Sequence, residues 1–206
     1  SESINNIFLR MKKVDILIFF IGLAHEKGSN ATRNDHFQTN YQILVDLLEA
    51  MKKNNCQPLK IIFASTISVY GERKDIDSYD ENVIPMPRTP YALSKDMAEK
   101  YLLNNFSNTS WILRFAPVYS KYFKLNLERR TKIFDTYYKI GSGNCFLSLC
   151  NVKNINIVID GIIKNLVEPG IYNISDKKNY VYNDLLKLQS AKNVLPVPRL
   201  FIWFVY

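Results

Sequence analysis

A tyrosine and a lysine four residues apart are the pair in this sequence best suited to acid–base chemistry. Tyr91 and Lys95 stand in the string YALSK, directly after a proline. On a helix, positions i and i+4 lie on one face, and an ammonium beside a phenol lowers a pKa that is ordinarily about 10. Such a tyrosine can exchange protons near neutral pH. Alone the pattern is weak, because an exposed helix pair among 13 tyrosines would look the same.

A hydroxyl after a buried strand gives that pair a context. Residues 59–63 are an apolar run that predicts a strand, and Ala64-Ser65-Thr66 follows it and begins a loop. Ligands of open parallel sheets bind at the carboxyl ends of the strands. Thr66 would lie at such an end, and we therefore expect it across a cleft from Tyr91.

The hydrophobic pattern predicts strands that alternate with helices. Runs rich in Ile and Phe indicate buried parallel strands, and helical spacing of apolar residues indicates the helices between them. Strand–helix alternation at this spacing predicts right-handed crossovers and a parallel sheet with helices on its faces. The predicted strands are 14–21, 59–63, 111–115 and 171–174, the predicted helices are 37–54, 91–105, 126–140, 152–166 and 182–188, and the predicted loops are 24–35 and 71–90.

Three strings carry a resemblance to a known family. STISVYG, PYALSK and LRFAPVY resemble, in this order and spacing, the motifs of the extended short-chain dehydrogenase/reductases, especially the NAD-dependent nucleotide-sugar epimerases and dehydratases. The resemblance extends over residues 14–176. It implies an α/β fold, in which a Rossmann-type parallel sheet is joined to a small α+β substrate lobe. Residues 1–119 would belong to the NAD-binding domain, and residues 120–206 mainly to the lobe, with some elements returning to the core.

The resemblance assigns roles to the residues named so far. Tyr91 matches the catalytic tyrosine, Lys95 the lysine that also bonds the nicotinamide ribose, and Thr66 the residue that hydrogen-bonds the reacting sugar oxygen. Asn40 looks like the family asparagine near the active site, with a plain surface amide as the alternative. Further matches to the cofactor cleft are Gly22, for which a turn glycine is the alternative, and Pro117 and Val118 beside the nicotinamide.

The charge of the chain fits an anionic substrate. Its formal net charge is +8, and arginines suit bidentate phosphate contacts. Arg129 and Arg130 are therefore candidates to meet the diphosphate of a nucleotide sugar, with an exposed basic surface as the alternative. Nucleic-acid binding is not favoured, because the sequence holds neither a block of like charges nor an aromatic–basic motif.

The sequence departs from the family in three places. No G-x-x-G-x-x-G stands before residue 14, the acidic residue after the second strand is absent, and Ser120-Lys121 replaces a Gly-Pro. Residues 14–21 would be the family's fourth strand, so we expect a fragment that lacks the N-terminal strands. Because the dinucleotide pyrophosphate ordinarily rests on a glycine turn and a helix N-terminus, residues 1–206 alone should bind NAD weakly.

The residues that follow Thr66 narrow the choice between possible reactions. Thr66-Ile67-Ser68 stands where 4,6-dehydratases carry Thr-Asp-Glu, and without those carboxylates elimination lacks its acid and base. This favours a 4-epimerase that acts on a UDP-sugar with NAD, or with NADP, for cell-surface polysaccharide precursors. The alternatives are an NADP-dependent 4-ketoreductase and a non-catalytic relic or binding module of the same fold.

Composition indicates a cytoplasmic protein. Three cysteines are too few for a disulfide scaffold, and residues 1–10 lack the apolar core of a signal peptide. The apolar run 14–24 is far shorter than the ~20 residues that span a bilayer. The apolar run 200–206 is either a core element or the start of a membrane-surface helix. Two histidines and three cysteines lack metal-ligand spacing, and a homodimer is compatible with the resemblance.

Overall fold

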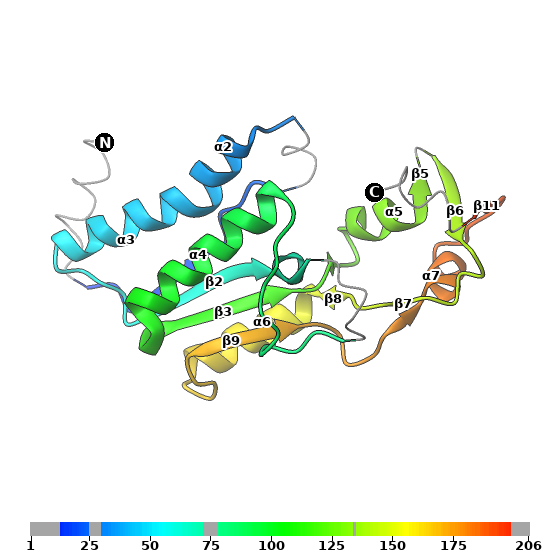
Figure 1. Cartoon of the computed structure of the whole chain (residues 1–206). Coiled ribbons are helices and arrows are strands. Elements are labelled where there is room, and N and C mark those ends of the chain that lie inside the picture. The colour runs from blue at the N-terminus through cyan, green and yellow to red at the C-terminus, as the bar shows by residue number, and fades with distance from the viewer. Residues whose placement is uncertain (1–12, 25–29, 72–77, 134, 199–206) are drawn as a thin grey trace. The chain divides into compact units, whose positions relative to one another are not determined.

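In the computed structural model, which describes residues 13–24, 30–71, 78–133 and 135–198, the apolar runs form the strands of one sheet (Figure 1). The strand order is β1-β2-β3-β9. Neighbouring pairs β1–β2 and β2–β3 are parallel, with Ile18 opposite Ile62 and Phe63 opposite Ile112. The predicted parallel sheet is therefore confirmed. Its strands are β1 (Ile16–Phe19), β2 (Lys60–Thr66), β3 (Ser110–Phe115) and β9 (Gly170–Ile174).

The chain divides into two compact units. Unit 1 consists of the described residues of Ser1–Phe115 and Ile159–Asn173 and contains nearly all of the sheet. Unit 2 consists of the described residues of Ala116–Val158 and Ile174–Tyr206. No helix in the described part of the chain is long and apolar enough to span a bilayer. The apolar run 200–206 lies outside the described residues.

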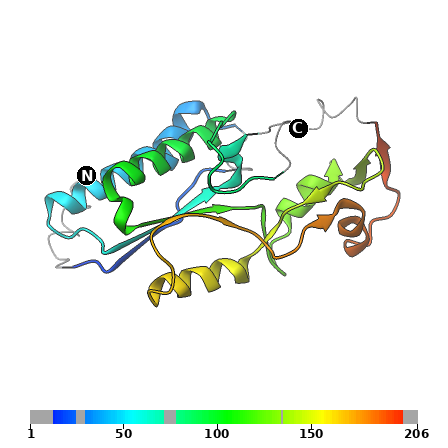
Figure 2. The same ribbon diagram turned by 60° about the horizontal axis from the view of Figure 1, so that its bottom comes forward.

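Helices cover one face of the sheet in unit 1. Figures 1 and 2 show α3 and α4 side by side on this face, and the end of α6 on the other. The first helix begins earlier than predicted, because Thr32 and Asp35 form a reciprocal capping box in which each side chain accepts a hydrogen bond from the other residue's backbone. The helical elements are α2 (Arg33–Phe37), the π-helical turn η2 (Gln38–Gln42), α3 (Ile43–Lys53) and α4 (Pro90–Phe106).

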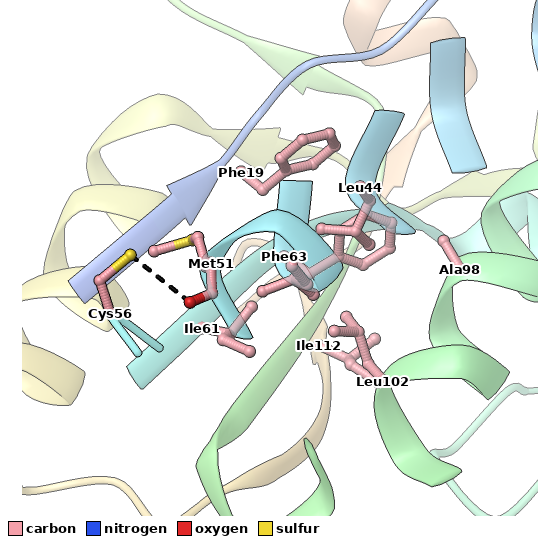
Figure 3. Packing of buried hydrophobic residues seen from close by; sticks show 10 residues of the cluster. Phe19, Leu44, Met51, Cys56, Ile61, Phe63, Ala98, Leu102 and Ile112 are labelled. Atoms are coloured by element: carbon pink, nitrogen blue, oxygen red, sulfur yellow. Dashed lines mark hydrogen bonds between the residues drawn. The ribbon is translucent and has the colours of Figure 1, made fainter. Parts of the chain in front are cut away.

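The core of unit 1 lies between the sheet and the helices α3 and α4 (Figure 3). The rings of Phe19 and Phe63 stack with their centroids 6.1 Å apart. Beneath α3, the buried Cys56 thiol donates a hydrogen bond of 3.5 Å to the Met51 carbonyl. The packing is apolar on both sides of β2, which explains why its sequence shows a continuous rather than an alternating apolar run. The other core members are Leu44, Leu48, Ile61, Ala98, Leu102 and Ile112.

Unit 2 is built from short elements. Strand β4 (Val118–Tyr119) pairs in parallel with β8 (Cys150–Asn151), and β5 pairs antiparallel with β6. The predicted helix 182–188 is confirmed as α7. The remaining elements are α5 (Leu125–Thr131), β5 (Lys132–Ile133), β6 (Thr136–Ile140), β7 (Phe146–Leu147), α6 (Val152–Ile163), β10 (Tyr180–Val181), α7 (Tyr182–Leu188) and β11 (Leu195–Val197).

The predicted helix 126–140 is wrong beyond its first half. Helix α5 ends at Thr131, and the chain continues as strands β5 and β6. The segment 131–140 is rich in Thr, Ile, Phe and Tyr, which favour strands. The predicted helix 152–166 is also shorter, because α6 ends at Ile163 and Asn165 takes a left-handed conformation with φ of 58°.

Candidate functional site

Helix α4 presents Tyr91 and Lys95 at the carboxyl end of the sheet. The helix begins where expected, because Thr89 caps it by accepting a hydrogen bond of 3.2 Å from the Ala92 amide and Pro90 occupies its first position. Tyr91 lies in the first turn and is half-buried, whereas Lys95, one turn later, is only 3% exposed. The pair is therefore part of the interior rather than an exposed helix pair.

Thr66 lies at the end of β2 and reaches the same tyrosine. Strand β2 continues through Ala64-Ser65-Thr66, although the sequence predicts that a loop begins there. The Thr66 hydroxyl accepts a hydrogen bond of 3.2 Å from the Ser68 amide at the start of the short helix η3 (Ile67–Tyr70). The Thr66 side chain also hydrogen-bonds the phenol of Tyr91. The structure thus brings Thr66, Tyr91 and Lys95 together in unit 1.

Backbone carbonyls at two strand ends hold the Lys95 ammonium. It donates to the Ala64 carbonyl at 2.9 Å and to the Ile21 carbonyl at 3.4 Å, and it lies 4.8 Å from the centroid of the Phe63 ring. Burial lowers the pKa of Lys95 to about 8, against the opposing effect of the Glu99 carboxylate. Lys95 therefore changes charge within a pH range in which an ordinary lysine stays protonated.

The pKa of Tyr91 is shifted in the opposite direction to the one that the sequence predicts. Burial raises the pKa of the phenol above its ordinary value, and the hydrogen bond from Thr66 offsets this only in part. The expected lowering of this pKa is therefore wrong for the chain by itself. The reason is that removing water from around a phenolate costs more than its neighbours in this chain return.

Asn40 is a buried connector, not a surface amide. It belongs to the π-helical turn η2 and is fully buried. Its Oδ1 accepts from the Leu23 amide at 2.6 Å, and its Nδ2 donates to the Leu23 carbonyl at 3.2 Å and to Ser94 Oγ at 3.0 Å. Ser94 in turn donates to the Tyr91 carbonyl at 2.8 Å. Asn40 therefore ties the segment after β1 to the turn of α4 that carries Tyr91.

Gly22 lies where these side chains converge. A Cβ atom at this position would stand 3.2 Å from Lys95 Nζ and 3.5 Å from Asn40 Oδ1. Such a contact with the ammonium is tighter than nine in ten real Cβ contacts. The absence of a side chain at residue 22 thus leaves the room that Lys95 and Asn40 use.

We expect Asn40→Ala to lower the free energy of unfolding by about 1–3 kcal/mol, because it removes the hydrogen bonds to the partly buried amide and carbonyl of Leu23. Urea unfolding of the chain, followed by circular dichroism, measures the change. The matched control is Asn156→Ala, which alters an exposed asparagine on α6 and should change stability by less than about 0.5 kcal/mol. Equal effects of the two substitutions would contradict the connecting role.

Three buried residues around the site were missed by the sequence interpretation. The His36 ring packs against the Tyr91 ring, with 6.3 Å between centroids and an angle of 63°. Glu99 and Ser65 are joined by a buried hydrogen bond behind Lys95. Helical spacing held a signal for two of them, because His36 stands four residues before Asn40 and Glu99 four after Lys95.

The remaining predicted site residues lie in unit 2. Val118 belongs to β4, and the Pro117 carbonyl accepts a hydrogen bond of 3.0 Å from the Cys150 amide. Arg129 is exposed near the end of α5, and Arg130 donates to the Asn126 carbonyl at 2.9 Å. Because these four residues belong to the other unit, their placement against Tyr91 stays a prediction.

A family model, described as the NAD dependent epimerase/dehydratase family, matches residues 1–161. Two curated relatives are 34% identical to the chain. The uncharacterized UDP-glucose epimerase YtcB of Bacillus subtilis (strain 168) matches over 116 residues, which are 53% of this chain and 34% of that protein. The UDP-glucose 4-epimerase of Yersinia enterocolitica matches over 95 residues, which are 46% of this chain and 27% of that protein. The matches thus span 34% and 27% of the length of these two relatives.

Solved structures share the fold at lower identity. The UDP-glucose 4-epimerase of Thermus thermophilus, in complex with NAD, superposes with a TM-score of 0.72 at 21% identity, over 96% of this chain and 69% of that one. The UDP-glucuronic acid 4-epimerase of Bacillus cereus, also with NAD, gives 0.71 at 20% identity, over 95% and 65%. The dTDP-4-dehydrorhamnose reductase of Bacillus anthracis, with NADP, gives 0.70 at 21%, over 96% and 70%. These likenesses confirm the Rossmann-type fold class.

Proposed function

Since the chain belongs to the NAD-dependent epimerase/dehydratase family, we propose that the protein that carries it is a nucleotide-sugar 4-epimerase that uses NAD. The observation that carries this proposal is the gathering of Thr66, Tyr91 and Lys95 at the carboxyl ends of the strands. Ligands of open α/β sheets bind at such ends. A UDP-sugar is the proposed substrate, because both curated relatives are named as UDP-glucose epimerases.

The residues in unit 1 fit the nicotinamide end of a dinucleotide. Gly22 leaves space beside the Lys95 ammonium, which can donate a further hydrogen bond to a ribose hydroxyl in addition to those to Ile21 and Ala64. NAD would supply the hydride acceptor and donor there. Unit 2 is the proposed side for the nucleotide diphosphate, through Arg129 and Arg130. We propose NAD as the cofactor and NADP as its alternative, as in the NADP-bound reductase of the same fold.

The protein's own residues then divide the work of proton transfer. Tyr91, as phenolate, accepts the proton of the sugar hydroxyl and later returns it. Thr66 holds the oxygen that loses this proton, and Lys95 favours the phenolate through its positive charge. Because burial raises the pKa of Tyr91 in the chain alone, with Lys95 present, the reaction near neutral pH requires further positive charge at the phenol, which an oxidised nicotinamide would supply.

Epimerisation suits the loop after Thr66 better than elimination does. Ile67 and Ser68 open η3 directly beside Thr66, and neither carries a carboxylate. An elimination of water needs an acid and a base at the sugar, whereas epimerisation needs one group that removes and returns the same proton. The local sequence and its position at the site therefore support the epimerase.

The deciding experiment follows the configuration at C4 of the sugar. The protein that carries this chain is incubated with UDP-glucose and NAD, and the products are identified by proton NMR. We expect UDP-galactose to form up to equilibrium, and to form about 10²–10⁴-fold more slowly with Tyr91→Phe. A sugar whose C4 configuration stays unchanged with the wild-type protein under saturating substrate and cofactor would overturn the proposal in favour of a non-catalytic relic.

Thr66→Val should lower turnover by up to about tenfold, because it removes one hydrogen bond worth about 0.5–1.5 kcal/mol. The same NMR assay gives the rate. Thr66→Ser keeps the hydroxyl and is the matched control, for which we expect turnover close to that of the wild type. A Thr66→Ser variant as slow as Thr66→Val would show that the methyl group, and not the hydroxyl, matters.

A further inference from the structure

A buried carboxylate lies one helical turn behind Lys95. Glu99 is 1% exposed and follows Lys95 by four residues on α4, so the two side chains share a face of the helix. Its carboxylate pairs with the guanidinium of Arg114 on β3, with a shortest N–O distance of 2.6 Å. The proposed mechanism gives Glu99 no step. A buried charge at this place nevertheless acts on its neighbours more strongly than an exposed one would.

The same carboxylate is bonded to the strand end that forms the site. The Ser65 hydroxyl donates a hydrogen bond to Glu99 Oε1. Ser65 stands between Ala64, whose carbonyl accepts from Lys95, and Thr66, whose side chain bonds the Tyr91 phenol. The hydrogen bond that Ser65 donates to Glu99 of α4 therefore fixes the end of β2. The contacts of Lys95 with Ala64 and of Tyr91 with Thr66 both depend on this segment.

Arg114 holds Glu99 in this position from the other side. Its Nη1 donates to the Tyr70 hydroxyl at 2.8 Å, and its guanidinium carbon lies 4.8 Å from the centroid of the Tyr70 ring. The Tyr70 hydroxyl donates to Asn173 Oδ1 at 2.9 Å. Because every partner in this chain of contacts lies in unit 1 and Arg114 is 2% exposed, the carboxylate has little freedom to turn away from Lys95 and Ser65.

We propose that Glu99 is a positioning residue that holds the charged form of Lys95 and, through Ser65, the end of β2 in their places around Tyr91. Its consequence for catalysis rests on the proposed epimerase function, whereas its effect on Lys95 is a property of this chain alone. Glu99 acts on the reaction only through Lys95 and Ser65.

The charges around Lys95 determine the direction of the expected effect. Burial lowers the pKa of Lys95, and the Glu99 carboxylate raises it. The other titratable or charged groups that face this region are Tyr91 on α4 itself, Arg114 on β3, Tyr70 on η3 and His36 on α2. Asp96 and Lys100 of α4 form their own pair at 2.6 Å. When the negative charge of Glu99 is removed, burial therefore lowers the pKa of Lys95 without an opposing effect from this carboxylate.

The test is the titration of Lys95 in Glu99→Gln. The full chain is labelled with 13C-lysine, and the Lys95 Cε signal is assigned by its loss in Lys95→Met and followed with pH by NMR. We expect the Lys95 midpoint to fall by about one pH unit or more, as for loss of an opposite charge at close range. The matched control is Asp96→Asn, which removes another buried carboxylate from the same helix and should leave the midpoint unchanged. An unchanged midpoint in Glu99→Gln overturns the proposal.

A second variant keeps the test valid if an unpaired Arg114 prevents folding. Glu99→Gln combined with Arg114→Met removes both buried charges, an exchange that proteins tolerate well. The Lys95 midpoint is again expected below that of the wild type, because the carboxylate that raises it is gone. A midpoint at or above the wild-type value in this folded double variant would also overturn the proposal.

The link through Ser65 is tested by a pair of serine variants. Ser65→Ala removes the bond to Glu99, and Ser110→Ala removes an equally buried hydroxyl on β3 whose Oγ has no hydrogen-bond partner among the described residues. In the NMR assay we expect Ser65→Ala to lower kcat about tenfold with little change in KM, and Ser110→Ala to leave both unchanged. Equal kcat values for the two variants overturn the link. If the wild type itself shows no epimerisation, the proposed function fails, and the Lys95 titration still decides the role of Glu99.

Discussion

Tyr91→Phe is expected to lower the turnover of the protein that carries this chain by about 10²–10⁴-fold, the usual contribution of general acid–base catalysis. The substitution removes the hydroxyl that would exchange the sugar proton and keeps the ring that packs against His36. Binding of UDP-glucose should change little, because the phenol matters mainly while the proton moves. The rate of C4 inversion by proton NMR and the affinity by titration calorimetry measure the two effects separately.

A tyrosine elsewhere on α4 provides the control. The Tyr101 hydroxyl donates to Glu49 Oε1 at 2.9 Å, away from Thr66 and Lys95. Tyr101→Phe should therefore leave turnover near the wild-type rate. If Tyr91→Phe retained wild-type turnover as well, the Tyr-x-x-x-Lys pattern would be a coincidence, and family membership would describe the fold without the chemistry.

Arg114→Met is expected to lower the free energy of unfolding of the chain by about 3–5 kcal/mol, because it leaves the buried Glu99 carboxylate without a counter-charge. Arg114 and Glu99 side chains are each 2% exposed, and their shortest N–O distance is 2.6 Å. Urea unfolding followed by circular dichroism measures the change. Combining Arg114→Met with Glu99→Gln should restore most of the lost stability, because no unpaired charge remains.

A surface salt bridge of the same length is the control for burial. Asp160 on α6 and Lys164 just after this helix also meet at 2.6 Å, but their side chains are 59% and 61% exposed. Lys164→Met should cost less than about 1 kcal/mol, because water screens such pairs. Similar losses for Arg114→Met and Lys164→Met would show that burial does not determine the strength of the inner pair.

The sequence predicts most of what positions the site in unit 1. The apolar runs at 14–21 and 59–63 identify the strands β1 and β2. The prediction that 14–21 is a buried strand is wrong for most of its length, because Phe19 is buried but Ile18, Phe20 and Ile21 are exposed. Pro90 identifies the start of α4. The predicted proximity of Thr66 and Tyr91 is confirmed, because the carboxyl end of β2 and the first turn of α4 come together in unit 1. The catalytic roles of these residues stay a prediction.

The remaining features of the site, and the strands of unit 2, depend on tertiary contacts that no local sequence pattern predicts. Glu99 reads as an ordinary surface residue of a helix until Arg114, fifteen positions later, is placed beneath it. The pKa of Tyr91 likewise depends on how deeply the fold buries the phenol. In unit 2, the segment 131–140 has helical spacing of apolar residues, but its β-branched and aromatic side chains form the strands β5 and β6. These strands pair with each other, and β6 also pairs with β11, which is distant in sequence.

The arrangement of strands and helices in unit 1 has a consequence for how the site forms during folding. The site residues follow one another in the order in which their elements are made: Gly22 after β1, Asn40 on η2, Thr66 on β2, and Tyr91 and Glu99 on α4. Closing short loops between neighbouring elements costs less chain entropy than joining distant segments, and contacts that are local in sequence form quickly. The geometry around Tyr91 is therefore encoded by consecutive strand–helix units, and its formation does not wait for unit 2 to fold.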